Sequence, residues 1–256
     1  MSLRGWMEEA YARRLQRQCV RFPEHIAIIQ DGNRRFARTQ GVPTTEGHRM
    51  GADTTERVLD WACDLGIRHI TLYCFSTENF HRESEEVQGL FGLFRETFNR
   101  VVVDERVHRQ KIRVRVMGDR ALLPDDLIEA IDAAEEATRG YDRYFLNVAL
   151  AYGGRNEILV AAKKVLSRVQ QGSIHPEEID VRTVEAHLSH GLCIPPVDLI
   201  IRTGNERRTS NFLPWLANGN ECAVYFCAPY WPEFRKIDLL RAVRVYDQRA
   251  RAQEGA

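Results

Sequence analysis

The sequence lacks a long apolar run, paired cysteines and an excess of charge of either sign. No segment approaches the roughly 18 apolar residues that span a membrane, and the N-terminus lacks the apolar core of a secretion signal. The six cysteines are scattered without a CxxC pair, which excludes the usual zinc-ligand spacing and argues against a disulfide framework. We therefore expect a cytoplasmic protein with reduced, buried thiols.

The charges balance, because Lys plus Arg and Asp plus Glu both total 36. No global electric field therefore attracts the chain to nucleic acid, and we expect no nucleic-acid partner. Most of the basic residues are arginines, which bind phosphate groups in a bidentate manner better than lysines do.

Short apolar runs alternate with longer amphipathic segments, a pattern typical of βα units. The alternation predicts an α/β fold with a mostly parallel, six-stranded sheet flanked by helices. The expected strands are residues 25–30, 69–75, 112–117, 144–151, 197–201 and 222–226, and the expected long helices are residues 47–65, 83–107, 124–138, 154–170 and 234–249.

No internal repeat and no linker rich in Gly, Pro or Ser divides the chain. We expect a single domain, residues 22–256, preceded by a helical extension, residues 1–21. The extension carries Trp6, Met7 and Tyr11 on one side of an amphipathic helix. Docking of this side against the domain is the favoured interpretation, and peripheral contact with a membrane is the alternative.

The first expected strand ends in Asp31-Gly32-Asn33-Arg34-Arg35, just before a helix. In open α/β sheets, ligands bind beyond the carboxyl ends of the strands. A carboxylate there can hold Mg²⁺, and the N–H groups that open the helix can bind an anion. An ordinary Asp-Gly turn is an equally good interpretation of these five residues alone.

Two further strand ends carry polar segments. Residues 76–82 are polar, aromatic and basic, as at the rim of a pocket, although Ser76 or Thr77 could equally cap a helix. Residues 202–212 hold three arginines, three hydroxyl side chains and a glycine within nine residues, which suits a diphosphate site; a solvated loop is the alternative. Glu221 could add a second carboxylate for a metal, and the alternative interpretation is an ordinary surface residue.

The expected helix at 83–107 has an apolar stripe wider than a surface helix needs. Core packing is the simpler explanation, and the wall of an apolar tunnel is the alternative. The stripe consists of Val87, Leu90, Phe91, Phe94, Phe98, Val101 and Val102.

Four segments together resemble, in order, the signature blocks of the cis-prenyltransferase (undecaprenyl diphosphate synthase) family. The residues of several blocks are more similar to those of archaeal members than to those of bacterial members. The four segments are residues 25–35 (HIAIIQDGNRR), 75–80 (FSTENF), 151–155 (AYGGR) and 202–215 followed by Glu221. The resemblance extends from about Phe22 to Arg249. It implies an enzyme that condenses isopentenyl diphosphate with an allylic prenyl diphosphate, farnesyl or geranylgeranyl, to give a long-chain polyprenyl diphosphate.

The resemblance also implies roles for single residues. Asp31 would be catalytic and would bind Mg²⁺ with Glu221, and Asn79 would be linked to proton removal. The residues implied in substrate binding are Gly32, Asn33, Arg34, Arg35, Phe36 and His48 for the allylic diphosphate, Ser76, Thr77, Glu78, Phe80 and Arg82 near the reacting groups, and Arg202, Arg208 and Ser210 for isopentenyl diphosphate. An apolar tunnel for the product and a homodimer are implied as well.

The chain departs from the family pattern at a few positions. Asn205 replaces the second Gly of the usual Arg-Thr-Gly-Gly-Glu block, and Thr44 stands where bacterial members carry a diphosphate-binding Arg. Two other classes of function stay open: a non-catalytic family member that binds a partner subunit, and an unrelated phosphate-handling α/β enzyme. The second lacks a Walker loop, because no Gly-Lys-Ser/Thr follows Gly32.

Overall fold

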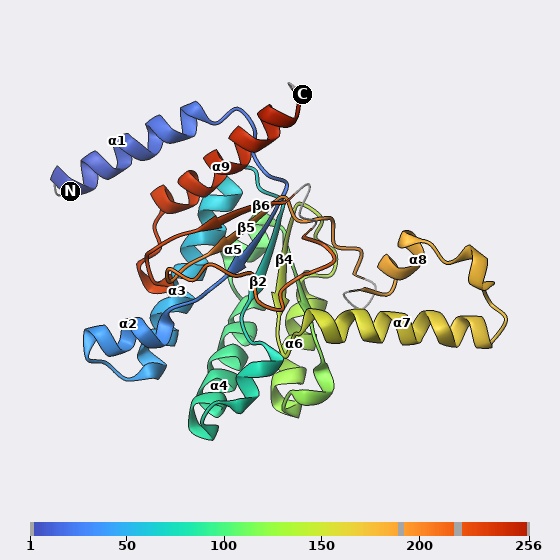
Figure 1. The fold of residues 1–256 in the computed structure, drawn as a ribbon. Helices are drawn as coiled ribbons and strands as arrows, with labels where there is room; N and C mark the ends of the chain where they lie inside the picture. Colours follow the sequence, from blue (N-terminus) through green and yellow to red (C-terminus); the bar gives the residue numbers. More distant parts are fainter. Residues whose placement is uncertain (1–2, 189–191, 218–221, 255–256) are drawn as a thin grey trace.

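The core of the protein is a six-stranded sheet in which every pair of neighbouring strands is parallel (Figure 1). The computed structural model describes residues 3–188, 192–217 and 222–254. The strand order is β3-β4-β2-β1-β5-β6. The strands are β1 (His25–Ile29), β2 (His69–Tyr73), β3 (Ile112–Met117), β4 (Tyr144–Ala149), β5 (Leu199–Arg202) and β6 (Ala223–Phe226).

All six expected strands are present, and their first and last residues differ from the expected ones by at most two positions. β1 lies in the middle, with Ile28 beside Leu72 of β2 and Ile201 of β5. All five of its residues are buried, which is the pattern of a strand covered on both faces. The expected α/β fold class, one parallel sheet flanked by helices, is therefore confirmed.

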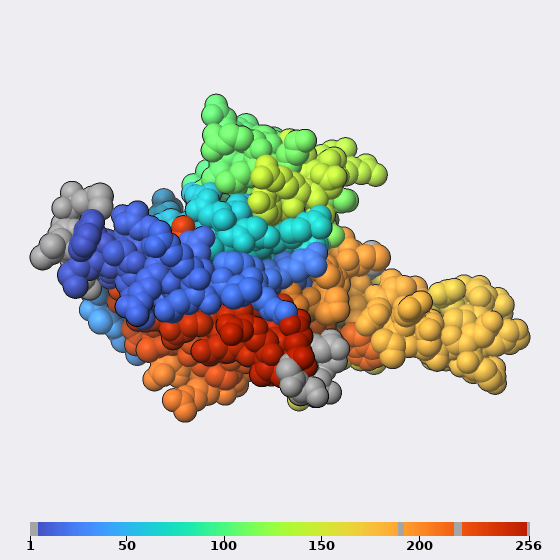
Figure 2. Space-filling model, turned by 90° about the horizontal axis from the view of Figure 1, so that it is seen from above, coloured from blue at the N-terminus to red at the C-terminus, as the bar shows by residue number. Residues whose placement is uncertain are grey.

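The helices are α1 (Leu3–Gln18), α2 (Asn33–Gln40), α3 (Thr44–Asp64), α4 (Ser84–Val101), α5 (Glu105–Gln110), α6 (Asp125–Thr138), α7 (Gly154–Gln170), α8 (Val181–Glu185) and α9 (Lys236–Glu254). Short 3₁₀ turns are η1 (Thr77–His81), η2 (Arg120–Leu122), η3 (Pro176–Glu178) and η5 (Trp231–Glu233). Five of the long helices, α1, α3, α4, α6 and α9, contribute to the core on one face of the sheet, where Ile26 and Ile28 of β1 point. The other face, with Ala27 and Ile29, is covered largely by residues 192–217. α7 and α8 form an arm that projects from the body (Figures 1 and 2).

The single helix expected over residues 83–107 is wrong, because the chain breaks between α4 and α5. α4 ends at Val101, and Asp104 then caps α5 by accepting a hydrogen bond from the Arg106 N–H at 2.8 Å. The apolar pattern continues through the break, so periodicity alone could not reveal it. Asp104 is a residue type that favours helix N-caps over helix interiors.

The N-terminal extension forms α1, which lies along α9 in both views (Figures 1 and 2). Its buried side carries Ala12 and Leu15, whereas Trp6 and Met7 are exposed. Just beyond α1, the N–H group of Arg21 donates to Asp247 of α9 at 3.0 Å. The extension docks through a neighbouring face of the helix, not through the side that bears Trp6. Among the described residues, no helix has the length and apolarity that crossing a membrane requires.

Two histidines sit inside the sheet and are neutral for structural reasons. The side chain of His25 is fully buried, with Nε2 2.7 Å from the Thr71 hydroxyl and Nδ1 2.8 Å from the Pro195 carbonyl. Since a carbonyl only accepts, Nδ1 carries the proton. His69 stacks on Phe145 with ring centroids 4.5 Å apart. Burial lowers the pKa of both histidines to about 4.

We predict that stability falls with acidity because of these two histidines. Below pH 6.5 the two histidines bind protons in the unfolded chain, whereas in the folded protein they stay neutral down to about pH 4. The free energy of unfolding therefore decreases as the pH falls over that interval. The expected loss between pH 6.5 and 5 is about 2 kcal/mol for each histidine. Urea unfolding at both pH values checks this. His69→Phe should remove about half of the loss, the exposed His81→Gln should leave it intact, and equal losses in all three proteins would contradict the assignment.

Candidate active site

The carboxylate of Asp31 joins two groups of basic residues at the carboxyl edge of the sheet. Its Oδ2 accepts a hydrogen bond from Arg202 at 2.8 Å, and its Oδ1 accepts one from Arg35 at 3.1 Å. β1 and β5 are neighbours, so the residues that follow them meet at this edge. The Thr203 hydroxyl also donates to the Asp31 carbonyl at 2.7 Å, which fixes the backbone.

Gly32 lets α2 begin directly beside Asp31. Its φ of 111° lies in the left-handed region, and a Cβ there would stand 2.6 Å from Tyr230 Cδ1. The N–H groups that open α2 therefore lie next to the Asp31 carboxylate and the Arg34 and Arg35 side chains. A helix N-terminus of this kind is a site for anions such as phosphate.

Arg202 organises the loop that follows β5. It is 4% exposed, and its second guanidinium nitrogen donates to the Arg208 carbonyl at 2.7 Å and to Ser210 Oγ at 2.8 Å. The loop turns at Gly204 and at Asn205, which has a φ of 57°. Asn adopts this left-handed conformation more readily than most residues, so the departure from Gly at this position is accommodated.

The segment after β2 is held by its own capping groups. The Ser76 N–H donates to Asn79 Oδ1 at 3.0 Å, so Ser76 is the N-cap of η1, in agreement with the helix-cap interpretation of this segment. Glu78 accepts a hydrogen bond from Asn211 at 3.2 Å. Burial alone would raise the pKa of Glu78, but hydrogen bonds from its own backbone and from Ser76, Asn211 and Thr77 lower it. Glu78 therefore stays charged and ties this segment to the loop after β5.

Glu86, which was not among the expected site residues, contacts three of the expected substrate-binding residues. Its carboxylate lies 2.9 Å from Arg82, 3.4 Å from His48 and 3.6 Å from Arg34. Burial lowers the pKa of His48, and the hydrogen bond and negative charge of Glu86 partly offset this lowering. A signal was available, because Glu86 follows Arg82 by four residues and opens a helix. The contacts from α2 and α3 are tertiary and could not be inferred.

A cavity of about 910 Å³ leads inward from these residues, between the sheet and helices α3 and α4. α4 contributes Leu90, Phe94 and Phe98 to its walls, so the wide apolar stripe serves both the core and the cavity. Further apolar wall residues include Ile29, Ala52, Leu59, Leu72, Leu93, Val101, Val107, Ile112, Val114, Leu146 and Val148.

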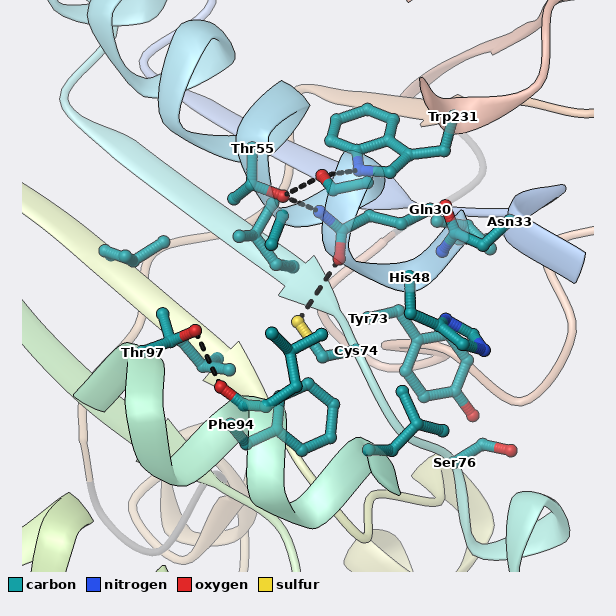
Figure 3. Close-up of a pocket in the computed structure, with 18 of the residues that line it drawn as sticks. Gln30, Asn33, His48, Thr55, Tyr73, Cys74, Ser76, Phe94, Thr97 and Trp231 are labelled. Carbon is teal, nitrogen blue, oxygen red and sulfur yellow. Dashed lines mark hydrogen bonds between the residues drawn. The ribbon is translucent and has the colours of Figure 1, made fainter. Parts of the chain in front are cut away.

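One wall of the cavity is polar near the mouth, where Asp31 and the arginines lie. Figure 3 shows Gln30 hydrogen-bonded to both Thr55 and Cys74, at 2.7 and 3.3 Å, and Trp231 bonded to the carbonyl of Gly51. Burial raises the pKa of the Cys74 thiol to about 12, so it remains protonated. These hydrogen bonds pair the side chains of Gln30, Thr55, Cys74 and Trp231 with partners within the protein.

Most of the expected site residues line this one cavity. They are Asp31, Asn33, Arg34, His48, Ser76, Glu78, Asn79, Arg82, Arg202, Arg208 and Ser210. Three others are not part of the lining. Phe36 is buried, Phe80 packs against Phe75 with ring centroids 4.9 Å apart, and Thr77 lies close to Gly153, where a Cβ would stand 2.8 Å from Thr77 Oγ1. Arg35 lies 3.6 Å from Glu206 and stacks on Tyr230. Glu221 lies outside the described residues.

The donor set fits Mg²⁺ better than a transition metal. Within residues 3–188, 192–217 and 222–254, no three His, Cys, Asp or Glu side chains form a metal-binding group. Asp31 contributes one carboxylate, 28% exposed and at the cavity mouth. Mg²⁺ is commonly bound through one or two carboxylates, with waters and substrate phosphates as the other ligands. A diphosphate held at this mouth would supply those phosphates.

We predict that Arg202→Lys weakens binding of inorganic diphosphate by roughly tenfold or more. A lysine cannot contact Asp31, the Arg208 carbonyl and Ser210 together, and losing one charge-assisted hydrogen bond costs about 1.5–3 kcal/mol. Isothermal titration calorimetry with diphosphate and Mg²⁺ measures the change. Arg207→Lys, an exposed position in the same loop, is the matched control. Equal affinities for the two variants would show that Arg202 does not organise an anion site.

Comparisons with known proteins agree with this geometry. Residues 29–254 match the family model described as putative undecaprenyl diphosphate synthase. The tritrans,polycis-undecaprenyl-diphosphate synthase (geranylgeranyl-diphosphate specific) of Halobacterium salinarum is 52% identical over 240 residues, covering 94% of this chain and 79% of that protein. The enzyme of the same name from Archaeoglobus fulgidus is 51% identical over 227 residues, 89% of this chain and 90% of its own.

Solved structures extend the similarity to three dimensions. Lavandulyl diphosphate synthase from Lavandula x intermedia, in complex with dimethylallyl diphosphate, has a TM-score of 0.82 and 34% identity over 88% of this chain and 95% of its own. A probable undecaprenyl diphosphate synthase from Campylobacter jejuni has a TM-score of 0.71 and 27% identity over 89% and 96% of the two chains. The chain thus belongs to the undecaprenyl diphosphate synthase family of prenyltransferases, as its archaeal-type signature blocks indicated.

Proposed function

We propose that the protein is a Mg²⁺-dependent cis-prenyltransferase that condenses isopentenyl diphosphate with an allylic prenyl diphosphate to give a polyprenyl diphosphate. The observation that carries the proposal is the position of Asp31, between two groups of basic residues at the mouth of a largely apolar cavity. Such a mouth suits two diphosphates, and such a cavity suits one long hydrocarbon chain.

The two basic groups divide the two substrates between them. The N-terminus of α2, with Asn33, Arg34 and Arg35, would bind the allylic diphosphate, and His48 completes this side. Arg202, Arg208 and Ser210 would bind isopentenyl diphosphate. Because Arg35 and Arg202 both contact Asp31, the two diphosphates would lie close together, with the allylic carbon near the isopentenyl double bond.

In the reaction, a carbon–carbon bond forms as the allylic carbon–oxygen bond breaks, and a proton then leaves the isopentenyl unit. Asp31 would hold Mg²⁺, which when bound would supply positive charge to neutralise the departing diphosphate. The arginines and the helix N–H groups bind that diphosphate through preorganised donors, which favours the charge that develops. Asn79, fixed through its Oδ1 by the Ser76 N–H, would orient the groups involved in proton removal.

The growing chain would extend into the cavity between the sheet and α4, which makes this cavity the tunnel that the family resemblance implies. Each buried methylene would stabilise the complex by about 0.8 kcal/mol. The archaeal relatives named above are specific for geranylgeranyl diphosphate by name, and we propose the same allylic substrate here.

Other features of the proposal concern assembly and location. We propose a homodimer, as the family resemblance implies, and peripheral contact of the N-terminal extension with a membrane. The exposed Trp6 and Met7 of α1 support the second point, because apolar side chains of this kind insert at a membrane interface. We propose that residues 1–21, which include α1, form an extension of a catalytic domain that spans residues 22–256.

We predict that Asp31→Asn lowers incorporation of labelled isopentenyl diphosphate into lipid by at least about 10²-fold, because the variant loses the proposed metal ligand. Chelation of Mg²⁺ should abolish incorporation in the unaltered protein, and added Mg²⁺ should restore it. Asp53→Asn, at an exposed position of α3, is the control. Full incorporation by Asp31→Asn, or by the unaltered protein in chelator, would contradict the proposed role of Asp31 as a metal ligand. No incorporation by the unaltered protein would favour a non-catalytic family member that binds a partner subunit.

We also predict that kcat/KM is higher with geranylgeranyl diphosphate than with farnesyl diphosphate. The longer substrate buries one more isoprene unit in the apolar cavity from the first condensation onward. Initial-rate measurements with both substrates at saturating isopentenyl diphosphate give the ratio. A preference for farnesyl diphosphate would contradict the proposed substrate while leaving the reaction type intact.

A further inference from the structure

Tyr230 lies beside the mouth of the active site, although it belongs to none of the four signature blocks. It is half-buried and directly precedes η5 in the chain. Two of its neighbours are parts of the site, namely the backbone of Gly32 and the side chain of Arg35. The ring can therefore influence how the site binds a ligand without lining the cavity itself.

The guanidinium of Arg35 is in close contact with Tyr230 and with Gly204 of the loop after β5. Its central carbon lies 5.4 Å from the centre of the Tyr230 ring. On Gly204, a Cβ would stand 2.6 Å from Arg35 Nη2, so a larger residue there would displace this nitrogen. We call Tyr230 and Gly204 the arginine clamp, because together they restrict where the guanidinium can lie.

Within the clamp, the guanidinium nitrogens of Arg35 are directed at two carboxylates. Nη2 lies 3.1 Å from Asp31, and Nη1 lies 3.6 Å from Glu206. Asp31 lines the cavity, whereas Arg35 does not and reaches the mouth from its rim. The Arg35 side chain is 39% exposed, so without the clamp it could turn into solvent. Its orientation therefore decides whether it meets a ligand held beside Asp31.

Backbone hydrogen bonds fix the arginine clamp to both halves of the site. The Trp231 N–H donates to the Asp31 carbonyl at 3.0 Å, and the Gly204 N–H donates to the Pro229 carbonyl at 2.8 Å. The residues on either side of Tyr230 are thus tied to the end of β1 and to the loop after β5. The ring has a defined position before any ligand arrives.

We propose that Tyr230 is a positioning residue for the allylic substrate: its ring holds the Arg35 guanidinium in the orientation that binds the allylic diphosphate. This inference rests on the proposed function, since it refines the role of Arg35 in that reaction. A flexible arginine loses conformational entropy when it binds a ligand, and an aromatic face that orients it in advance removes part of this cost. The attraction between a guanidinium and an aromatic face requires the ring and not the hydroxyl.

The first test is binding of geranylgeranyl diphosphate with Mg²⁺ present, measured by isothermal titration calorimetry at a fixed detergent concentration. Without isopentenyl diphosphate no condensation follows, so the titration reports binding alone. Tyr230→Leu removes the ring and should weaken binding by roughly two- to fivefold. Tyr230→Phe retains the ring and should bind as the unaltered protein does. Tyr11→Leu is the matched control, because the Tyr11 ring lies 5.9 Å from Arg241, outside the site.

A double-mutant cycle with Arg35→Gln separates positioning from packing. If the ring acts through Arg35, Tyr230→Leu should have no further effect on affinity once Arg35 is replaced. If the ring only supports the turn at Gly32, the two substitutions should weaken binding independently, and that result would overturn the proposal. Thermal unfolding verifies that each variant is folded, and Tyr230→Met takes the place of Tyr230→Leu if the latter does not fold.

Steady-state kinetics give a second readout that a general structural defect would not reproduce. Tyr230→Leu should raise the KM for geranylgeranyl diphosphate and leave the KM for isopentenyl diphosphate unchanged, because Arg35 belongs to the allylic side of the mouth. A larger effect on the KM for isopentenyl diphosphate would contradict the assignment.

The proposed function and the role of Tyr230 can fail separately. If the unaltered protein binds geranylgeranyl diphosphate but incorporates no isopentenyl diphosphate, the proposed function fails, and the binding cycle still decides the role of Tyr230. If folded Tyr230→Leu binds as tightly as the unaltered protein, the positioning role fails and the reaction stands. If the unaltered protein does not bind geranylgeranyl diphosphate, both are overturned.

Discussion

The structure of the site depends on one carboxylate that two arginines share. Asp31 follows the central strand of the sheet, and Arg35 and Arg202 reach it from opposite sides, on α2 and at the end of β5. Without Asp31, two guanidinium groups would face each other at close range in a half-buried mouth, which is unfavourable. The carboxylate therefore allows positive charge to be concentrated at the mouth, where we propose that the diphosphates bind and that Asp31 holds Mg²⁺.

The same balance recurs around the mouth. Glu86 neutralises part of the charge of Arg34 and Arg82, and Glu206 pairs with Arg35. These acidic residues explain how a chain with no net charge contains a basic site: the arginines at the mouth named here each pair with a carboxylate. Such pairs fix side chains that would otherwise lose conformational entropy on binding, so the donors are preorganised before a substrate arrives.

Residues that follow strands were the most predictable part of the site. Because parallel strands end at one edge, Asp31, Ser76 and Arg202 could be brought together from the sequence alone, and the strands themselves follow from buried apolar runs. What could not be predicted depends on how helices lie against one another. Glu86 meets His48 only because α4 packs beside α3, and α1 docks through Leu15 although Trp6 makes the more apolar side. Periodicity reports which residues prefer burial, but not which partner covers them.

The cavity has charge at both of its ends, and the two ends differ in what the charges face. At the mouth, the arginines share the carboxylates of Asp31, Glu86 and Glu206, and helix N–H groups add further donors, so donors remain for an anionic ligand. At the far end, Arg106 is surrounded by three carboxylates, and its charge is already matched. An amphipathic molecule can therefore enter in one orientation only, with its diphosphate at the mouth. The uneven distribution of acids and bases along one apolar cavity gives the site its direction, and that direction is what a reaction that repeatedly extends the same end of a chain requires.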